Sequence, residues 1–210
     1  MKLFTPPPAD DTPATTRIEA FSDGVIAIIV TLMIFEIKIP ALPNASNEAV
    51  LAALWQLGPK LISFLVSFVT VCIFWVNHHH FMHGVKQADR ALLWYNNHLL
   101  LWLAVIPFVT EFIGEYPLQP VVVALYGFVL MMGAVAFALM INHVFFKGRL
   151  TYGHVPEEIK KQEFRRSLIG IVAYAVSVVT AFFHPYISMT IFFLVPVYYF
   201  FPRTVGKNAV

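Results

Sequence analysis

Four long stretches of the sequence contain no Asp, Glu, Lys or Arg: residues 61–85, 91–110, 116–146 and 167–202. An α-helix needs about 20 mostly apolar residues to cross the hydrocarbon core of a bilayer. Each of the first three stretches is long enough for one crossing, and the last is long enough for two. His184 and Pro185 divide that last stretch, because proline disfavours helical geometry in the residue before it. These stretches alone predict five membrane-spanning helices.

The composition supports a surface that faces lipid. Charged residues make up 12% of the chain and hydrophobic residues 59%, whereas a soluble domain usually carries about 25% charged residues. The net charge of +2 is too small to suggest a nucleic acid partner. The single cysteine, Cys72, excludes an internal disulfide and a zinc site of the cysteine type. We therefore expect an all-α integral membrane protein.

A further helix is predicted before these stretches, over residues 18–39. At 1.5 Å per residue it is about 33 Å long, and Pro40 and Pro43 follow it. Thr16 and Glu19 have the spacing of a capping box at its start. With this helix, the predicted spans lie near residues 18–39, 55–84, 91–114, 118–146, 163–183 and 186–201. We expect one transmembrane domain over residues 16–203, a disordered N-terminal tail over 1–15 and a C-terminal tail over 204–210.

The placement of lysine and arginine predicts the orientation of these six spans. Cytoplasmic loops of membrane proteins carry an excess of both residues. If the N-terminus is cytoplasmic, only Lys38 and Lys60 lie outside. The inside then holds Lys2, Arg17, Lys86, Arg90, Lys147, Arg149, Lys160, Lys161, Arg165, Arg166, Arg203 and Lys207. We expect both termini to be cytoplasmic.

The first predicted helix carries charged residues at its inner end and an apolar centre. Arg17, Glu19, Ser22 and Asp23 cluster at its start. Charges in a membrane helix mark function by default, although an Arg17 ion pair with Asp23 or Glu19 near the headgroups explains the cluster equally well. Further along, Ile28, Thr31, Leu32 and Phe35 recur at helical spacing on one face. This stripe is typical either of ordinary packing between helices or of a pore lining.

The string Arg17-x-x-x-Phe21-Ser22-Asp23-Gly24, followed by the Ile28, Thr31 and Leu32 pattern, resembles the transmembrane protein 175 family of potassium channels. A second block agrees with that resemblance, namely Trp75, Asn77, His78, His79 and His80, then Asp89, Asn96-Asn97 and the run ending at Pro107-Phe108. The similarity is specific in these two blocks, and it is only a hydropathy match in the last three spans. It points to the single-repeat bacterial members of the family.

The resemblance implies a homotetramer of six-helix subunits in the bacterial inner membrane, with the first helix of each subunit lining a central pore. It places the hydrophobic constriction on Ile28, the pore threonine on Thr31 and the next apolar ring on Leu32, with Phe35 a less secure match. It implies that Phe21, Ser22 and Asp23 hold the inner end of the helix. The permeant ion is K⁺, no cofactor is expected, and the partners are identical subunits and lipids.

One point about stoichiometry and one about selectivity follow from the residues themselves. A single helix cannot enclose a pore, so several identical chains must supply it, and closed cyclic symmetry is the usual outcome. The sequence lacks a Thr-Val-Gly-Tyr-Gly filter, so selectivity cannot come from stacked backbone carbonyls and we expect it to be modest. Glu36, near the outer end, either attracts cations to the mouth or pairs with Lys38.

The histidine block favours a buried polar network over a metal site. Polar groups at membrane depth must be satisfied within the protein, and the side chains of Asp23, Trp75, Asn77, His78, His79 and His80 offer complementary donors and acceptors. No His-Glu-x-x-His arrangement accompanies the histidines, so we expect no metal. Because histidine titrates near neutrality, a response to pH is a further hypothesis.

Three functions remain open at this point. The first is a potassium-permeable channel whose first-helix constriction acts as gate and selectivity element. The alternative is a proton-coupled secondary transporter using Asp23 and His78, His79 and His80, but no inverted repeat typical of transporters is evident. The third is a metal-dependent membrane enzyme, and we expect the chain not to be an enzyme.

Overall fold

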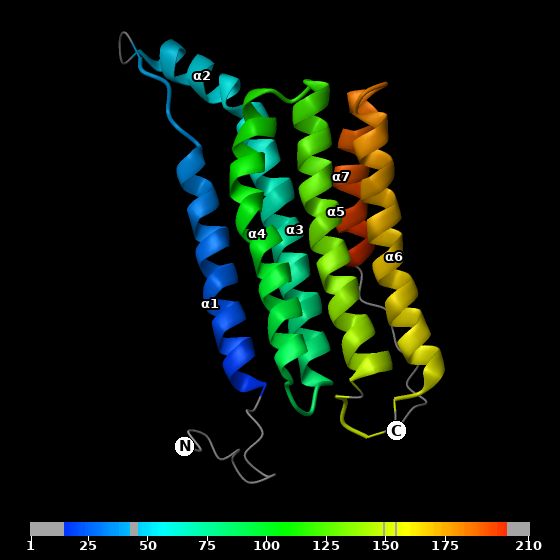
Figure 1. Ribbon diagram of the computed structural model, residues 1–210. Helices are drawn as coiled ribbons and strands as arrows, with labels where there is room; N and C mark the ends of the chain where they lie inside the picture. Colours follow the sequence, from blue (N-terminus) through cyan, green and yellow to red (C-terminus); the bar gives the residue numbers. More distant parts are fainter. Residues whose placement is uncertain (1–14, 43–45, 149, 154, 201–210) are drawn as a thin grey trace, which may run out of the picture.

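A computed structural model describes residues 15–42, 46–148, 150–153 and 155–200, which form a bundle of helices running side by side (Figure 1). The first helix, α1, continues into a short 3₁₀ turn, η1. The long helices are α1 (Thr16–Leu32, with η1 at Met33–Glu36), α3 (Gly58–His83), α4 (Arg90–Glu115), α5 (Pro120–Asn142), α6 (Glu157–Thr180) and α7 (Pro185–Phe200). The predicted tails lie outside the described residues, except for Thr15.

Four helices in the described part of the chain are long and apolar enough to cross a membrane: Thr16–Glu36, Gly58–His83, Arg90–Glu115 and Pro120–Lys147. They coincide with the first four predicted spans. The fifth and sixth predicted spans fall on α6, which has charged residues in its first turns, and on α7, which has 16 residues. The chain is therefore an all-helical, multi-pass membrane protein, and its last two crossings stay predictions.

Two helix boundaries differ from the sequence prediction. Residues 55–84 do not form one helix, because a separate helix, α2 (Asn47–Gln56), ends just before α3 and lies at an angle to the bundle (Figure 1). Ser46 caps α2 by accepting a hydrogen bond from the backbone N–H of Ala49 at 3.2 Å. The predicted capping box at Thr16 is wrong. Thr16 is already the first helical residue, and Thr15 before it makes no side-chain cap, because its backbone is helical where a cap needs extended geometry.

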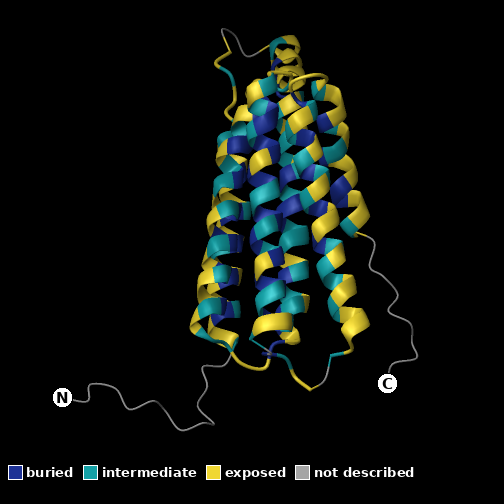
Figure 2. Cartoon of the chain, turned by 45° about the vertical axis from the view of Figure 1, so that its right-hand side comes forward, coloured by how far each residue is buried: buried dark blue, intermediate teal, exposed yellow. Residues whose placement is uncertain are grey.

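The core lies along α5, which packs against α4 on one side and α6 on the other. Buried residues run along the inner sides of the helices and exposed residues along the outer sides (Figure 2). Gly127 marks the closest approach of α5 to its neighbours, because a Cβ atom there would lie 2.6 Å from Ser177 Oγ on α6 and 3.3 Å from the Phe192 ring on α7. Small residues at such crossings let helices in a membrane approach closely.

Hydroxyl groups join three of the helices inside the bundle. Ser67 Oγ on α3 and Tyr126 Oη on α5 form a hydrogen bond of 2.8 Å, and Thr110 Oγ1 on α4 donates to Ser67 Oγ at 2.8 Å. All three side chains are buried. Because no water reaches the hydrocarbon depth, such groups must satisfy one another, and here they fix how far α3, α4 and α5 can slide.

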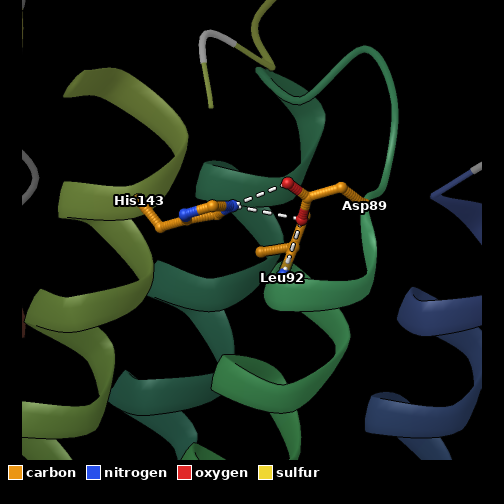
Figure 3. Close-up of polar contacts among 3 residues, drawn as sticks. All are labelled: Asp89, Leu92 and His143. Carbon is orange, nitrogen blue, oxygen red and sulfur yellow. Dashed lines mark hydrogen bonds and ion pairs between the residues drawn. The ribbon is translucent and has the colours of Figure 1, made fainter. Parts of the chain in front are cut away.

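A hydrogen bond between His143 and Asp89 fastens the loop between α3 and α4 to the end of α5 (Figure 3). Asp89 caps α4 by accepting from the Leu92 N–H at 2.7 Å, and the same carboxylate lies 2.8 and 3.1 Å from His143 Nε2. His143 opens a π-helical turn, η2 (His143–Lys147). Burial of the Asp89 carboxyl opposes its charge, but the hydrogen bonds from Leu92 and His143 outweigh burial and lower its pKa.

Candidate pore-lining helix

The α1 helix has one face against its own bundle and another face outside it. The inward face packs against α3 and α4 and is formed by Ile18, Ser22, Ile26, Ile29 and, in η1, Met33, all of them buried. The residues predicted to line a pore lie elsewhere on the helix. Ile28 is 58% exposed, Leu32 49% and Phe35 73%. With Phe21, Gly24 and Thr31, which are also exposed, they form a continuous stripe along α1, which we call the α1 stripe.

Thr31 is held in a fixed orientation within this stripe. Its hydroxyl lies 3.0 Å from the backbone carbonyls of both Ala27 and Ile28, one turn back along the helix. Since those carbonyls can only accept, the hydroxyl proton is directed into the helix. The lone pairs of the Thr31 oxygen are left available on the exposed side, where they can coordinate a cation or a water molecule.

In the N-terminal half of α1, the structure brings Asp23 together with Trp75 of α3. The indole Nε1–H of Trp75 donates to Asp23 Oδ1 at 2.8 Å. Arg17 forms no ion pair with either Asp23 or Glu19, so the local pair considered from the sequence is absent from this part of the chain. Phe21 is 58% exposed and belongs to the α1 stripe. The hydrogen bond from Trp75 to Asp23 thus links α1 to α3 within the sequence motif of residues 17–24.

A second, fully buried link joins α1, α3 and α4 through Asn96. The Asn96 amide nitrogen donates to Ser22 Oγ at 3.0 Å, and Ser22 Oγ lies 3.2 Å from Asn96 Oδ1. His78 Nε2 donates to the same Oδ1 at 2.8 Å, because an amide oxygen can only accept. The three side chains are at most 1% exposed, so this network fixes the position of α1 within the subunit.

The remaining residues of the histidine block lie outside this network. The His79 ring stacks on Trp75 with the centroids 5.7 Å apart. His80 Nδ1 donates to the Val76 carbonyl at 2.7 Å and its side chain is exposed. Asn77 makes no hydrogen bond to α1 within the described residues. Of the histidines proposed for the polar network, His78 is therefore the one that the structure brings against α1.

Charged residues from η1, from the segment that follows it, and from α3 and α4 lie beyond the C-terminal end of α1. Lys38 lies 3.9 Å from Glu111, and Lys60 forms an ion pair with Glu115. Glu36 is half-buried and lines a small cleft with Lys60 and Glu111. Lys38 thus pairs with Glu111 and not with Glu36. Within the described part of the chain, no group of three or more metal-ligating side chains is assembled.

Asn96 is the residue of this network that reasoning from the residue pattern missed. It entered the sequence argument only as part of the resemblance, although its partners, Ser22 and His78, were singled out. The sequence did contain one indication, because Asn96 is an amide in a stretch without charged residues and such a group must find a hydrogen-bond partner inside the protein. The sequence could not identify that partner, because Ser22 lies 74 residues away.

The residues of the α1 stripe and of the Asn96 network lie within the part of the chain that a family model matches. A family model described as endosomal/lysosomal potassium channel TMEM175 matches residues 17–107. A potassium channel of Chryseobacterium sp. (strain P1-3) is 36% identical over 186 residues, which cover 89% of this chain and 92% of the relative. Human endosomal/lysosomal proton channel TMEM175 is 33% identical over 110 residues, 50% of this chain but 22% of that protein.

A solved structure supports the same fold. The crystal structure of a lysosomal potassium-selective channel TMEM175 homolog from Chamaesiphon minutus matches with a TM-score of 0.78 at 29% identity, over 88% of this chain and 95% of that chain.

Proposed function

The chain belongs to the TMEM175 family of ion channels, and from this premise we propose that it is a potassium-permeable channel in which four identical chains place their α1 helices around one pore. Membership of this family makes it a channel and not an enzyme. The observation that carries the proposal is the α1 stripe, because it is exposed on a single chain while the opposite face of α1 is buried.

The exposed stripe is what an assembly of several chains requires. A pore needs several helices around it, and each chain supplies one α1. A closed ring of identical subunits provides the rest. The Asn96 network and the bond from Trp75 to Asp23 anchor α1 on its buried side, so the stripe is presented by a helix that is fixed in rotation and depth. The number of four follows the family resemblance.

The stripe has the chemistry of a hydrophobic gate with one polar ring. Rings of Ile28 and Leu32 form a narrow apolar constriction, which opens and closes by wetting and dewetting. Between them in sequence, the outward lone pairs of Thr31 replace part of the hydration of a passing cation. Phe35, 73% exposed one turn beyond Thr31, narrows the outer side. Selectivity is expected to be modest, because no backbone-carbonyl filter is present in the sequence.

We further propose that the channel lies in the bacterial inner membrane with both termini in the cytoplasm. The support is the excess of lysine and arginine on the side of the N-terminus. In this orientation the bond from Trp75 to Asp23 lies at the inner mouth and Glu36 at the outer end. Lipids and the other subunits are then the partners of the exposed faces.

The alternative of a proton-coupled transporter requires Asp23 and the histidines to pass protons in series. Asp23 accepts from Trp75, whose indole N–H can only donate. His78 is bonded instead to Asn96, and His80 to a backbone carbonyl. These hydrogen bonds do not connect Asp23 and the histidines into one chain along which a proton could pass, so they favour the channel over the transporter.

A flux assay in proteoliposomes tests the proposal. Vesicles loaded with potassium should show protein-dependent ion flux that does not saturate and needs no proton gradient, with potassium passing more readily than sodium. Saturable uptake that depends on a proton gradient would favour the transporter instead. The mass of the complex in a mild detergent tests the tetramer independently of any flux.

A further inference from the structure

The spacing of the α1 stripe extends to Arg17, in the first turn of the helix. Exposed residues of the stripe recur at alternating intervals of three and four positions, namely Phe21, Gly24, Ile28, Thr31 and Phe35. Arg17 lies four positions before Phe21 and is itself exposed. Side chains at such intervals share one face of an α-helix. Arg17 therefore lies on the face that carries the proposed constriction, at the end where α1 begins.

The charge of Arg17 is not neutralised by another residue in the described ranges. None of the ion pairs formed there includes Arg17. Two other polar residues of the motif do have partners, since Ser22 bonds to Asn96 and Asp23 bonds to Trp75. A guanidinium in a protein cannot be deprotonated. A full positive charge thus remains at the start of the stripe.

The two carboxylates of α1 nearest to Arg17 lie on other sides of the helix. Successive residues of an α-helix are turned by about 100°, so Glu19 and Asp23 lie about 200° and 240° around the helix from Arg17. Trp75 holds Asp23 on the side of α3. A helix with its side chains is about 10–12 Å across, which exceeds the Debye length of about 8 Å at physiological salt. In front of the stripe, Arg17 therefore dominates the electrostatic potential.

We propose that the Arg17 side chains form a cationic ring at the end of the pore where α1 begins, and that this ring slows the entry of potassium from that side. The proposal rests on the proposed function, because the stripes of several chains must face one axis to form a ring. Charged rings at a pore mouth raise or lower the local concentration of the permeant ion. The channel then conducts potassium more readily toward the side where α1 begins than away from it.

The size of this effect depends on the salt concentration. Four unit charges at roughly one Debye length from the axis lower the local concentration of a monovalent cation about threefold at about 0.15 M salt. At about 1 M salt the Debye length is about 3 Å, and the effect falls below about 1.5-fold. A change in the shape of the pore would not depend on salt in this way.

Chemical modification of one introduced cysteine tests the charge within a single folded channel. Cys72 is the only native cysteine, so Arg17→Cys is made in a Cys72→Ser background. A methanethiosulfonate with a trimethylammonium group then restores a positive charge, and one with a sulfonate group adds a negative charge. Single-channel currents are recorded in planar bilayers with equal potassium on both sides. Each reagent is applied to one side at a time, and the side from which it acts is the side where α1 begins.

Arg165→Cys in the same background is the matched control. Arg165 is also an exposed arginine, but it lies on α6, which packs against α5 and α7 at the opposite side of the bundle from α1 (Figure 1). A second comparison needs no modification, since Arg17→Lys keeps the charge and Arg17→Gln removes it.

Removing the charge should increase the potassium current that enters from the side where α1 begins. For Arg17→Cys and Arg17→Gln we expect an increase of about threefold at about 0.15 M salt and of less than about 1.5-fold at about 1 M. The positive reagent should return Arg17→Cys to the wild-type current, and the negative reagent should increase its current further. The current in the opposite direction should change less. Arg17→Lys, and Arg165→Cys with either reagent, should keep the wild-type current.

Three results would overturn the proposal. The first is an equal effect of the two reagents on Arg17→Cys, the second is an effect of the same size at both salt concentrations, and the third is an equal response of Arg165→Cys. The pore assignment is tested separately, by the conductance and ion preference of Ile28→Asn in the same recordings. If Ile28→Asn changes the ion preference and the charge at position 17 changes nothing, the pore assignment stands and the cationic ring alone is wrong.

Discussion

Replacing Asn96 with alanine should loosen the attachment of α1 to the rest of the subunit. The Asn96 amide has three hydrogen bonds, two with Ser22 and one with His78, and it is 1% exposed. Hydrogen bonds between membrane helices contribute about 0.6 kcal/mol each on average, so the three together contribute about 2 kcal/mol. Alanine also leaves the buried His78 N–H without an acceptor, which costs about 1–3 kcal/mol. Because these terms overlap, we expect the free energy of unfolding to fall by about 2–4 kcal/mol.

The neighbouring residue provides the matched control. Asn97 has the same side chain on the same turn of α4 but is exposed, so Asn97→Ala should change the free energy of unfolding by less than about 0.5 kcal/mol. Both variants are unfolded by denaturant in mild detergent and followed by far-UV circular dichroism. If Asn96→Ala is no less stable than Asn97→Ala, the amide does not hold the three helices together and the reasoning fails.

Two further predictions concern the packing of α5 and the contact between Asp89 and His143. Gly127→Ala should destabilise the protein by about 1–3 kcal/mol, because the added Cβ would lie 2.6 Å from Ser177 Oγ. Gly58→Ala, where nothing lies within 4 Å, should be tolerated in the same unfolding assay, and equal effects would contradict the packing. Because the pKa of Asp89 is lowered in the folded state from its ordinary 3.8, the hydrogen bonds that its carboxylate accepts from Leu92 and His143 stabilise the protein above about pH 4, and this stability is lost as the pH falls. Asp89→Asn should therefore lower the free energy of unfolding at neutral pH, and the variant should lose less of that free energy than the wild type as the pH falls below about 4. An unaltered dependence of the free energy of unfolding on pH would refute this.

Hydropathy was enough to predict most of the fold. The second, third and fourth spans follow from stretches without charge, because a lipid solvent admits little besides helices there, and the first span follows from an apolar centre between charged ends. The short helix α2 was missed because ten residues, Asn47–Gln56, are too few to signal a separate helix beside an apolar span. The start of α1 was misjudged for a local reason, since Thr15 already has helical backbone angles.

The site could be predicted only in part. Helical spacing placed Ile28, Thr31 and Leu32 on one face, but spacing does not say whether that face is buried or exposed. Burial of the opposite face against α3 and α4 decides this. The pairing of Ser22 with Asn96 depends on how α1 and α4 pack, and no local pattern in the sequence contains that information.

The most direct test of the pore assignment is the reversal potential of single channels in planar bilayers with potassium on one side and sodium on the other. Ile28→Asn replaces an apolar side chain of the α1 stripe, and Ile34→Asn makes the same change at an exposed position, 46% exposed, that lies off the stripe. We expect Ile28→Asn to raise the conductance and to move the reversal potential toward zero, while Ile34→Asn leaves both near the wild-type values. Unchanged conductance and ion preference in Ile28→Asn, or equal changes in both variants, would contradict the assignment of α1 as the pore-lining helix.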